Sequence, residues 1–262
     1  MQTIDIGINL TNRQFQHDRE SVLKNAIDAG VSPLIITGTS IRASEQAADY
    51  AAKHPAVLYS TAGVHPHDAK SCDSNTIPRL RALCKKPQVV AVGECGLDYD
   101  RDFSPREVQR KWFAAQIELA EELDLPLFLH ERAAFSDFHD ILKAYPARCE
   151  QAVVHCFTGS GRELDAYLAL GCHIGITGWV CDERRGEQLR AIVKYIPRDK
   201  LMIETDAPFL IPRSLKPRPQ SSRNEPMYLP HIAAQLAACR GEAAADLSEF
   251  TTANAKRFFG LE

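Results

Sequence analysis

The sequence predicts an α/β fold and, within that class, a single TIM (β/α)8 barrel over residues 1–262. Eight short runs rich in Val and Ile alternate with amphipathic segments. The ends of these runs follow one another at a mean spacing of about 28 residues, close to one strand–helix unit, and the chain length suits eight such units. A doubly wound open sheet is the alternative, because periodicity does not show whether a sheet closes. No G-x-G-x-x-G follows the first run, which argues against a dinucleotide-binding form.

The apolar runs are too short for an average helix, so we interpret them as strands that are buried on both faces. They lie at residues 4–10, 34–37, 57–61, 89–92, 125–130, 152–155, 173–176 and 201–204. Each is followed by a segment whose apolar residues recur with the period of a helix. The helical ranges that stand out are 18–29, 105–123, 137–144, 163–170, 187–196, 230–239 and 246–259. A breaker-rich stretch at 208–230 follows the eighth strand and is expected to overhang the barrel mouth.

Composition limits the partners and the compartment. Lys and Arg number 31 against 34 Asp and Glu, a net charge of −3, so no global positive field attracts nucleic acid. A polyanion would have to be held by local charges or by a metal. No apolar run approaches the roughly 20 residues of a membrane helix, and none of the eight cysteines forms a C-x-x-C pair. We therefore expect a cytoplasmic protein with reduced cysteines and no membrane partner. We also expect a monomer.

Ionisable side chains recur where the predicted strands end, which in a barrel enzyme is the edge that carries the chemistry. His65, Glu94, His130, His155 and Asp206 each stand at the end of a different run. Such groups are costly to bury, and a divalent cation would offset that cost. We predict that Glu94, His130 and His155 are metal ligands, because two imidazoles and one carboxylate leave coordination positions open for water.

The remaining strand-end groups are candidates for catalysis. Asp206 is predicted to accept the proton of a water molecule or to act as a further ligand. His65 is predicted to contact a substrate oxygen or to assist the leaving group. We expect a plain loop role for His67, and for Glu204 a buried structural role.

Aromatic and basic residues near the predicted mouth are candidates for holding a strand. Trp179 and Phe157 either stack on bases or pack in the core. Arginines in or near the same loops form a local group that could hold phosphates despite the negative net charge. They are Arg13, Arg132, Arg162, Arg184, Arg185, Arg213 and Arg223.

The strand-end motifs, in this order, resemble those of the TatD family of metal-dependent deoxyribonucleases. The matching segments are GVHPH at 63–67, GECGLD at 93–98, HER at 130–132, HCFTG at 155–159, ETDAP at 204–208 and SRNEP at 222–226. The resemblance spans about residues 5–260 and implies an amidohydrolase-like TIM barrel that hydrolyses phosphodiester bonds. It also implies that Glu94, His130 and His155 are metal ligands, and that His65 and Asp206 belong to the active site.

One segment departs from the family pattern. Most members open with D-x-H-x-H, whose histidines hold a metal, whereas here Gly7 and Asn9 stand in those positions after Asp5. Gly7 has no ligating side chain and Asn9 offers a neutral amide oxygen, so the first position of a two-metal site is weakened. The Gly-x-Asn form resembles a branch of the family that implies a Mg²⁺-dependent 3′-5′ exonuclease acting on single-stranded DNA and on RNA. Imidazole ligands alone favour zinc or manganese, and the loss of two histidines shifts the expectation toward Mg²⁺, with Mn²⁺ or Zn²⁺ as alternatives.

The expected function is thus a metal-dependent 3′-5′ exonuclease of single-stranded DNA or RNA, in DNA repair or nucleic-acid degradation. Asn9, Arg132 and Arg223 are expected to contact the substrate. Two other functions stay open. A small-molecule amidohydrolase or lactonase would use the same barrel and metal, and a non-catalytic binding protein would explain the missing first-strand histidines.

Overall fold

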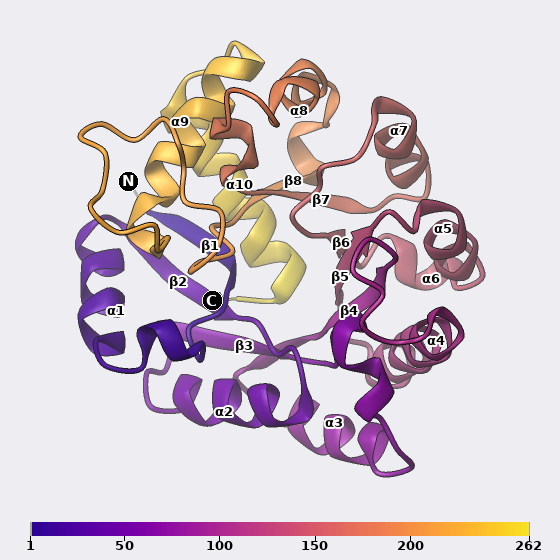
Figure 1. Cartoon of the computed structure of the whole chain (residues 1–262). Coiled ribbons are helices and arrows are strands. Elements are labelled where there is room, and N and C mark those ends of the chain that lie inside the picture. Colours follow the sequence, from indigo (N-terminus) through magenta and orange to yellow (C-terminus); the bar gives the residue numbers. More distant parts are fainter. Residues whose placement is uncertain (1, 262) are drawn as a thin grey trace. The chain divides into compact units, whose positions relative to one another are not determined.

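A computed structural model describes residues 2–261, and its eight strands follow one another in the sheet in chain order (Figure 1). The strands are β1 (Thr3–Ile8), β2 (Val31–Ile36), β3 (Leu58–Ala62), β4 (Val89–Asp98), β5 (Leu127–Arg132), β6 (Ala152–Val154), β7 (His173–Ile176) and β8 (Leu201–Ile203). The α-helices are α1 (Arg19–Asp28), α2 (Ile41–Ala51), α3 (Thr76–Cys84), α4 (Arg106–Leu123), α5 (Phe135–Lys143), α6 (Pro146–Cys149), α7 (Gly161–Ala169), α8 (Glu187–Ile192), α9 (Leu229–Arg240) and α10 (Ala244–Phe259). None of the described helices is both long and apolar enough to cross a membrane.

All eight predicted strands are present, but several differ in extent from the predicted ranges. β1 ends at Ile8 instead of residue 10, and β2 begins at Val31 instead of residue 34. β4 continues to Asp98 instead of ending at residue 92, and β5 begins and ends two residues later than predicted. Helices α2 and α3 occupy stretches for which no range was predicted. The buried face of α2 consists largely of alanines and a serine, which give a weak apolar signal, although Ser40 caps its first turn by accepting a hydrogen bond from the Ala43 amide.

The contacts divide the chain into two compact units. Unit 1 comprises Met1–Ile35, Cys156–Leu164 and Ile174–Glu262, and unit 2 comprises Ile36–His155 and Asp165–His173.

Unit 2 is built on the parallel strands β3 to β6, which pair in that order. All ten residues of β4 are buried, as expected of a central parallel strand that is covered on both faces. Helices α2 to α5 lie along one side of these strands (Figure 1). The longest of them, α4, packs Phe113 against Phe138 of α5 with ring centroids 4.9 Å apart.

Unit 1 joins the two ends of the chain. β7 pairs in parallel with β8, and the segment after β8 bonds to β1, since the Asp206 amide donates to the Gly7 carbonyl oxygen at 2.9 Å. Residues 208–225 contain no helix or strand, and their two ends are tied together. The Asn224 amide donates to the Pro208 oxygen, and the buried Asn224 side chain donates to the Thr205 oxygen at 2.9 Å. These bonds close residues 208–225 into a loop and tie its end to the residues that follow β8.

Candidate metal centre and active site

Glu94 projects from a bulge in β4. Gly93 and Cys95 pair with consecutive residues of β5, so Glu94 is an extra residue with no partner in the neighbouring strand. Gly93 and Gly96 have φ values of 142° and 145°, and a Cβ atom at either would lie 2.2 Å or 1.9 Å from a backbone oxygen of β5. Bulges redirect side chains, and the two glycines allow this one to form against a closely apposed strand. The GECG motif therefore presents one carboxylate at a defined place.

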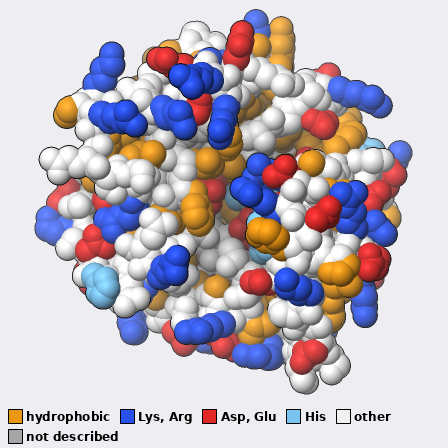
Figure 2. Space-filling model, viewed as in Figure 1, with side chains coloured by type: hydrophobic (Ala, Val, Ile, Leu, Met, Phe, Trp, Pro, Cys, Tyr) orange, Lys and Arg blue, Asp and Glu red, His pale blue; other side chains and the backbone are white. Residues whose placement is uncertain are grey.

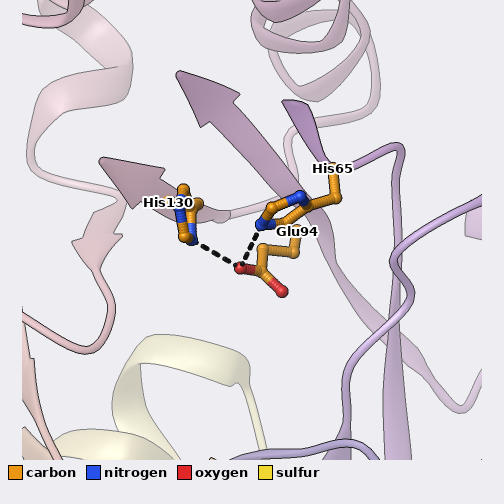
Figure 3. A group of neighbouring side chains, drawn as sticks. All are labelled: His65, Glu94 and His130. Atoms are coloured by element: carbon orange, nitrogen blue, oxygen red, sulfur yellow. Dashed lines mark hydrogen bonds and ion pairs between the residues drawn. The ribbon is translucent and has the colours of Figure 1, made fainter. Parts of the chain in front are cut away.

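Three imidazoles converge on a single oxygen of that carboxylate. Glu94 Oε1 lies 2.8 Å from His155 Nε2, 2.9 Å from His130 Nδ1 and 3.3 Å from His65 Nε2. His155 Nε2 and His130 Nδ1 are 3.4 Å apart. Figure 3 shows His65 and His130 on either side of the Glu94 carboxylate. The structure thus brings together the three residues that we predicted as ligands and adds His65 to them.

The cluster is buried, and its charges are strongly coupled. Burial alone would raise the pKa of Glu94, but the surrounding imidazoles of His155, His65 and His130 lower it well below its usual range. Burial lowers the pKa of His65 to about 4, so this imidazole is neutral at pH 7. Burial also opposes charge on His130, yet the carboxylates of Asp98 and Glu94 raise its pKa.

Asp98 and His67 extend the cluster, and neither was among our predicted catalytic or ligand residues. Asp98 Oδ2 lies 2.7 Å from His67 Nε2 and 3.4 Å from His130 Nε2. His67 also packs edge-on against His65, so it contacts the cluster in addition to the plain loop role that we expected. Burial would raise the pKa of Asp98, but its contacts with His130 and His67 lower it. The signal was present in the sequence, because Asp98 stands four residues after Glu94 and a strand returns to the same face at even spacings.

These residues fit a divalent metal ion. One ligand atom each from His65, Glu94 and His130 lie within 4.8 Å of one another. Imidazole nitrogens together with one carboxylate are ligands for a borderline divalent ion. A single carboxylate oxygen is poorly suited to three close imidazoles, whereas a cation can share the nitrogen and oxygen lone pairs. His130 Nε2, in addition, is buried, and its 3.4 Å contact with Asp98 Oδ2 is an ion-pair distance without hydrogen-bond geometry within residues 2–261.

Within unit 1, the strand-end residues form a hydrogen-bonded polar group. The Asn9 side chain, expected to contact substrate, donates to Asp206 Oδ1 at 2.9 Å, and Asp206 adopts a left-handed φ of 52°. Thr205 donates to Asp5 through both its amide, at 3.0 Å, and its hydroxyl. Glu204 is buried and accepts a hydrogen bond from the Cys156 amide at 2.6 Å, in keeping with the structural role expected for it.

The two arginines predicted to contact substrate lie in different settings. Arg132 is exposed, with Nη2 3.0 Å from Asp100 Oδ2. Arg223 is largely covered, because its guanidinium donates to both oxygens of Asp18 and to Glu225. These contacts raise the pKa of Arg223 and make it a tie between the 208–225 segment and the start of α1.

Comparison with known proteins identifies the family. The sequence profile described as "TatD related DNase" matches residues 4–260. A protein of Erwinia tasmaniensis named "3'-5' ssDNA/RNA exonuclease TatD" is 52% identical over 257 residues, which cover 98% of this chain and 99% of that protein. A protein of Shigella flexneri with the same name is 50% identical and is covered to 98%.

Solved structures agree with the sequence comparison. A TatD homologue from Escherichia coli K12 superposes with a TM-score of 0.90 at 27% identity, covering 99% of this chain and 98% of that one. A TatD family hydrolase from Entamoeba histolytica has a TM-score of 0.89 at 28% identity and is covered to 99%. An uncharacterised amidohydrolase from Saccharomyces cerevisiae superposes with a TM-score of 0.86 at 25% sequence identity. These likenesses confirm the predicted amidohydrolase-like TIM barrel, and with a profile match over nearly the whole length the chain belongs to the TatD family of related deoxyribonucleases.

Proposed function

We propose that this protein is a Mg²⁺-dependent 3′-5′ exonuclease that hydrolyses phosphodiester bonds in single-stranded DNA and in RNA. The observation that carries the proposal is the convergence of three imidazoles on one buried carboxylate oxygen, in a chain half of whose residues match proteins named for this activity. The group can hold a divalent cation, and Mg²⁺ is the ion we propose for it.

Glu94, His130 and His155 would hold the ion, as we expected from the sequence. When bound there, a divalent metal polarises a phosphoryl oxygen and lowers the pKa of water. Asp98 and His67 support this set by orienting His130 and His65, in the way that outer carboxylates commonly fix ligating imidazoles.

His65 and Asp206 are the proposed catalytic residues. His65 lies among the ligand atoms, which favours a role as a further ligand or as a hydrogen-bond donor to the substrate over that of an acid. Asp206 would take the proton of the attacking water, as the P–O bond to the leaving 3′-oxygen breaks and that oxygen takes a proton from solvent. Asn9, whose amide is bonded to Asp206, would act by orienting this carboxylate.

Arg132 is the better placed of the two arginines that we expected to contact the strand. Its side chain is exposed and meets one exposed carboxylate, so a phosphate can compete for it. Arg223 would have to give up two carboxylates before it could bind a phosphate.

A defined nuclease assay tests the proposal. A 5′-labelled single-stranded oligonucleotide is incubated with the protein and Mg²⁺, and products are resolved by length. We expect a ladder that shortens from the 3′ end, and more than a tenfold loss of rate, over about 1.4 kcal/mol, in Glu94→Gln, His155→Ala and Asp206→Ala. His17→Ala is the matched control, since this exposed histidine stands outside the cluster. Release of internal fragments, or full rates in the three variants, would contradict the proposal.

Two further parts of the expectation stay proposals. We propose that the protein is a monomer, which light scattering after size-exclusion chromatography would test. We also propose a cytoplasmic location and a place in DNA repair or nucleic-acid degradation. Localisation of a tagged protein tests the first of these, and survival of a deletion strain after DNA damage tests the second.

A further inference from the structure

Unit 1 contains a pocket whose walls combine aromatic and cationic side chains. Its volume is about 370 Å³, within the usual range for small-ligand sites. Two chain segments form most of it, the 178–185 segment before α8 and the 208–213 segment after β8. The residues that line it are Gln14, Gly178, Trp179, Asp182, Arg185, Pro208, Phe209, Leu210, Ile211, Arg213 and Ser222.

The aromatic residues of this pocket are available to a ligand. Phe209 is 46% exposed, one of the few large apolar side chains that face solvent in the described chain. Trp179 is half-buried, with the guanidinium of Arg185 5.7 Å from its ring centroid. Phe157, the other residue for which we considered base stacking, is 3% exposed and packs in the core. Of that pair, only Trp179 remains as a stacking surface.

The cationic side of the pocket is held in place by Asp182. Its Oδ1 accepts hydrogen bonds from the amides of Arg184 and Arg185, and its Oδ2 lies 3.1 Å from Arg213 Nε. A Cβ atom at Gly186 would lie 2.3 Å from the Trp179 oxygen, so this turn is closely folded. The Asp182 carboxylate is therefore already satisfied, while the Arg185 and Arg213 side chains remain exposed.

The charges favour an anionic ligand. Arg185 pairs with no carboxylate within residues 2–261, and Arg213 pairs there only with Asp182, through Nε. Lys and Arg side chains gather over the 208–225 segment and the turn before α8 in the upper left of Figure 2. Guanidinium groups suit phosphate, and an indole face accepts any base.

We infer that this pocket binds one unpaired nucleotide of a nucleic-acid strand, with its base on Trp179 and its phosphate on Arg185 and Arg213. The inference rests on the proposed function and adds to it a subsite outside the metal cluster. Stacking is independent of base identity, so the subsite would hold DNA and RNA without reading their sequence. A duplex keeps its bases stacked within the helix, so it would not use Trp179.

Binding can be measured without catalysis. In Trp112→Phe, Trp179 is the one remaining tryptophan of the two in the chain. With EDTA present to prevent hydrolysis, we expect a ten-residue oligo(dT) and the matching oligo(rU) to quench its fluorescence saturably, and a blunt hairpin duplex not to do so. Quenching by one strand type alone would contradict a subsite that holds DNA and RNA alike. No quenching by either strand would overturn the inference.

Variants separate the pocket from general electrostatics. We expect Trp179→Leu to weaken oligo(dT) binding about 5- to 150-fold in fluorescence anisotropy, the range of one stacked base, while Trp112→Leu leaves it unchanged. Arg185→Gln is expected to lower the salt dependence of binding, a slope loss of about 0.7, more than Arg184→Gln, which removes the same charge from an adjacent exposed residue outside the pocket. Equal effects of the two arginine changes, or full affinity in Trp179→Leu, would overturn the subsite.

The outcomes also separate this subsite from the proposed activity. A protein that binds the strand through Trp179 yet releases no nucleotide with Mg²⁺ would refute the nuclease and leave the subsite. A protein that degrades the strand from its 3′ end but is indifferent to Trp179 and Arg185 would keep the nuclease and refute the subsite.

Discussion

Asp5 carries a carboxyl group that is buried completely in the middle of β1. Its Oδ1 accepts hydrogen bonds from the amides of Gly7, at 3.2 Å, and Thr205, at 3.0 Å, and its Oδ2 contacts the Thr205 hydroxyl at 2.5 Å. Burial is the dominant influence and raises the pKa of Asp5 from 3.8 to about 7, against the hydrogen bonds from Thr205. The folded protein therefore holds a proton on Asp5 in a pH range where the unfolded chain has lost it.

The size and sign of the effect follow from that shift. Below pH 3.8 both states are protonated and this group does not oppose folding. Between pH 3.8 and about 7 the unfolded chain binds fewer protons than the folded one, so the free energy of unfolding falls as pH rises. Each pH unit costs about 1.4 kcal/mol, and the whole interval costs about 4 kcal/mol. Above pH 7 the loss is complete and constant.

Asp5→Asn isolates this contribution. The amide of Asn can keep both backbone hydrogen bonds and donate to Thr205 Oγ1, so it imitates the protonated carboxyl group without titrating. We expect the variant to gain stability relative to the unmodified protein as pH rises from 5 to 7, by about 2–3 kcal/mol in urea unfolding. His65, whose pKa is lowered to about 4, contributes the opposite trend, but it is common to both proteins and cancels in their difference.

A control and a clear refutation complete the design. Asp199→Asn removes the same charge from the exposed segment before β8 and reports the effect of net charge alone. A stability difference between Asp5→Asn and the unmodified protein that stays constant within about 0.5 kcal/mol from pH 5 to 8 would show that burial does not keep Asp5 protonated.

Three further predictions concern the metal cluster, the bulge in β4 and the ion pairs of Arg223. Glu94→Gln is expected to lower Mn²⁺ affinity in calorimetry more than tenfold, because it removes the one negative ligand among the imidazoles; a change below twofold would contradict this. Gly96→Ala is expected to lose about 2 kcal/mol or more in urea unfolding, since its Cβ would lie 1.9 Å from the His130 carbonyl oxygen at φ 145°, and a loss under about 0.5 kcal/mol would show that β4 can relax. Arg223→Ala is expected to lose about 1–2 kcal/mol, because two carboxylates lose their shared guanidinium, whereas unchanged stability would indicate that this side chain is held for the substrate instead.

The strands were predictable because their residues are β-branched and buried on both faces, and that signal is local. The extent of β4 was not, because Gly93, Glu94, Gly96 and Asp98 are residue types that are depleted in strands. Pairing with β5 overrides those preferences, and such pairing is a property of the folded sheet. Helix α2 was not predicted for a different reason, since its alanines provide little contrast in hydrophobicity between a buried and an exposed face.

The clustering of the proposed ligands was predictable to the extent that strand ends meet at one edge of a parallel sheet. Position along the chain told us that Glu94, His130 and His155 end three consecutive strands, and the structure places their atoms within hydrogen-bond reach. It grouped His65 with them at the same edge, but it did not indicate that His65 Nε2 would lie 3.3 Å from Glu94 Oε1, because His65 stands three residues beyond the end of β3. A residue in a loop gains its position from contacts such as the bond between its own amide and the Thr39 oxygen, which no periodicity reveals.

The cluster also depends on residues of β4 that are not among its proposed metal ligands. Without the bulge, each residue of β4 would pair with one residue of β5, and Glu94 would not be the unpaired extra residue. Gly93 and Gly96 allow the bulge because they have no Cβ atom to clash with β5. Asp98 then follows on the same strand and holds His130 and His67 from the other side. One strand thus supplies both the central carboxylate and its outer support. A substitution that straightens β4 should therefore remove the metal site while every predicted ligand remains in the sequence.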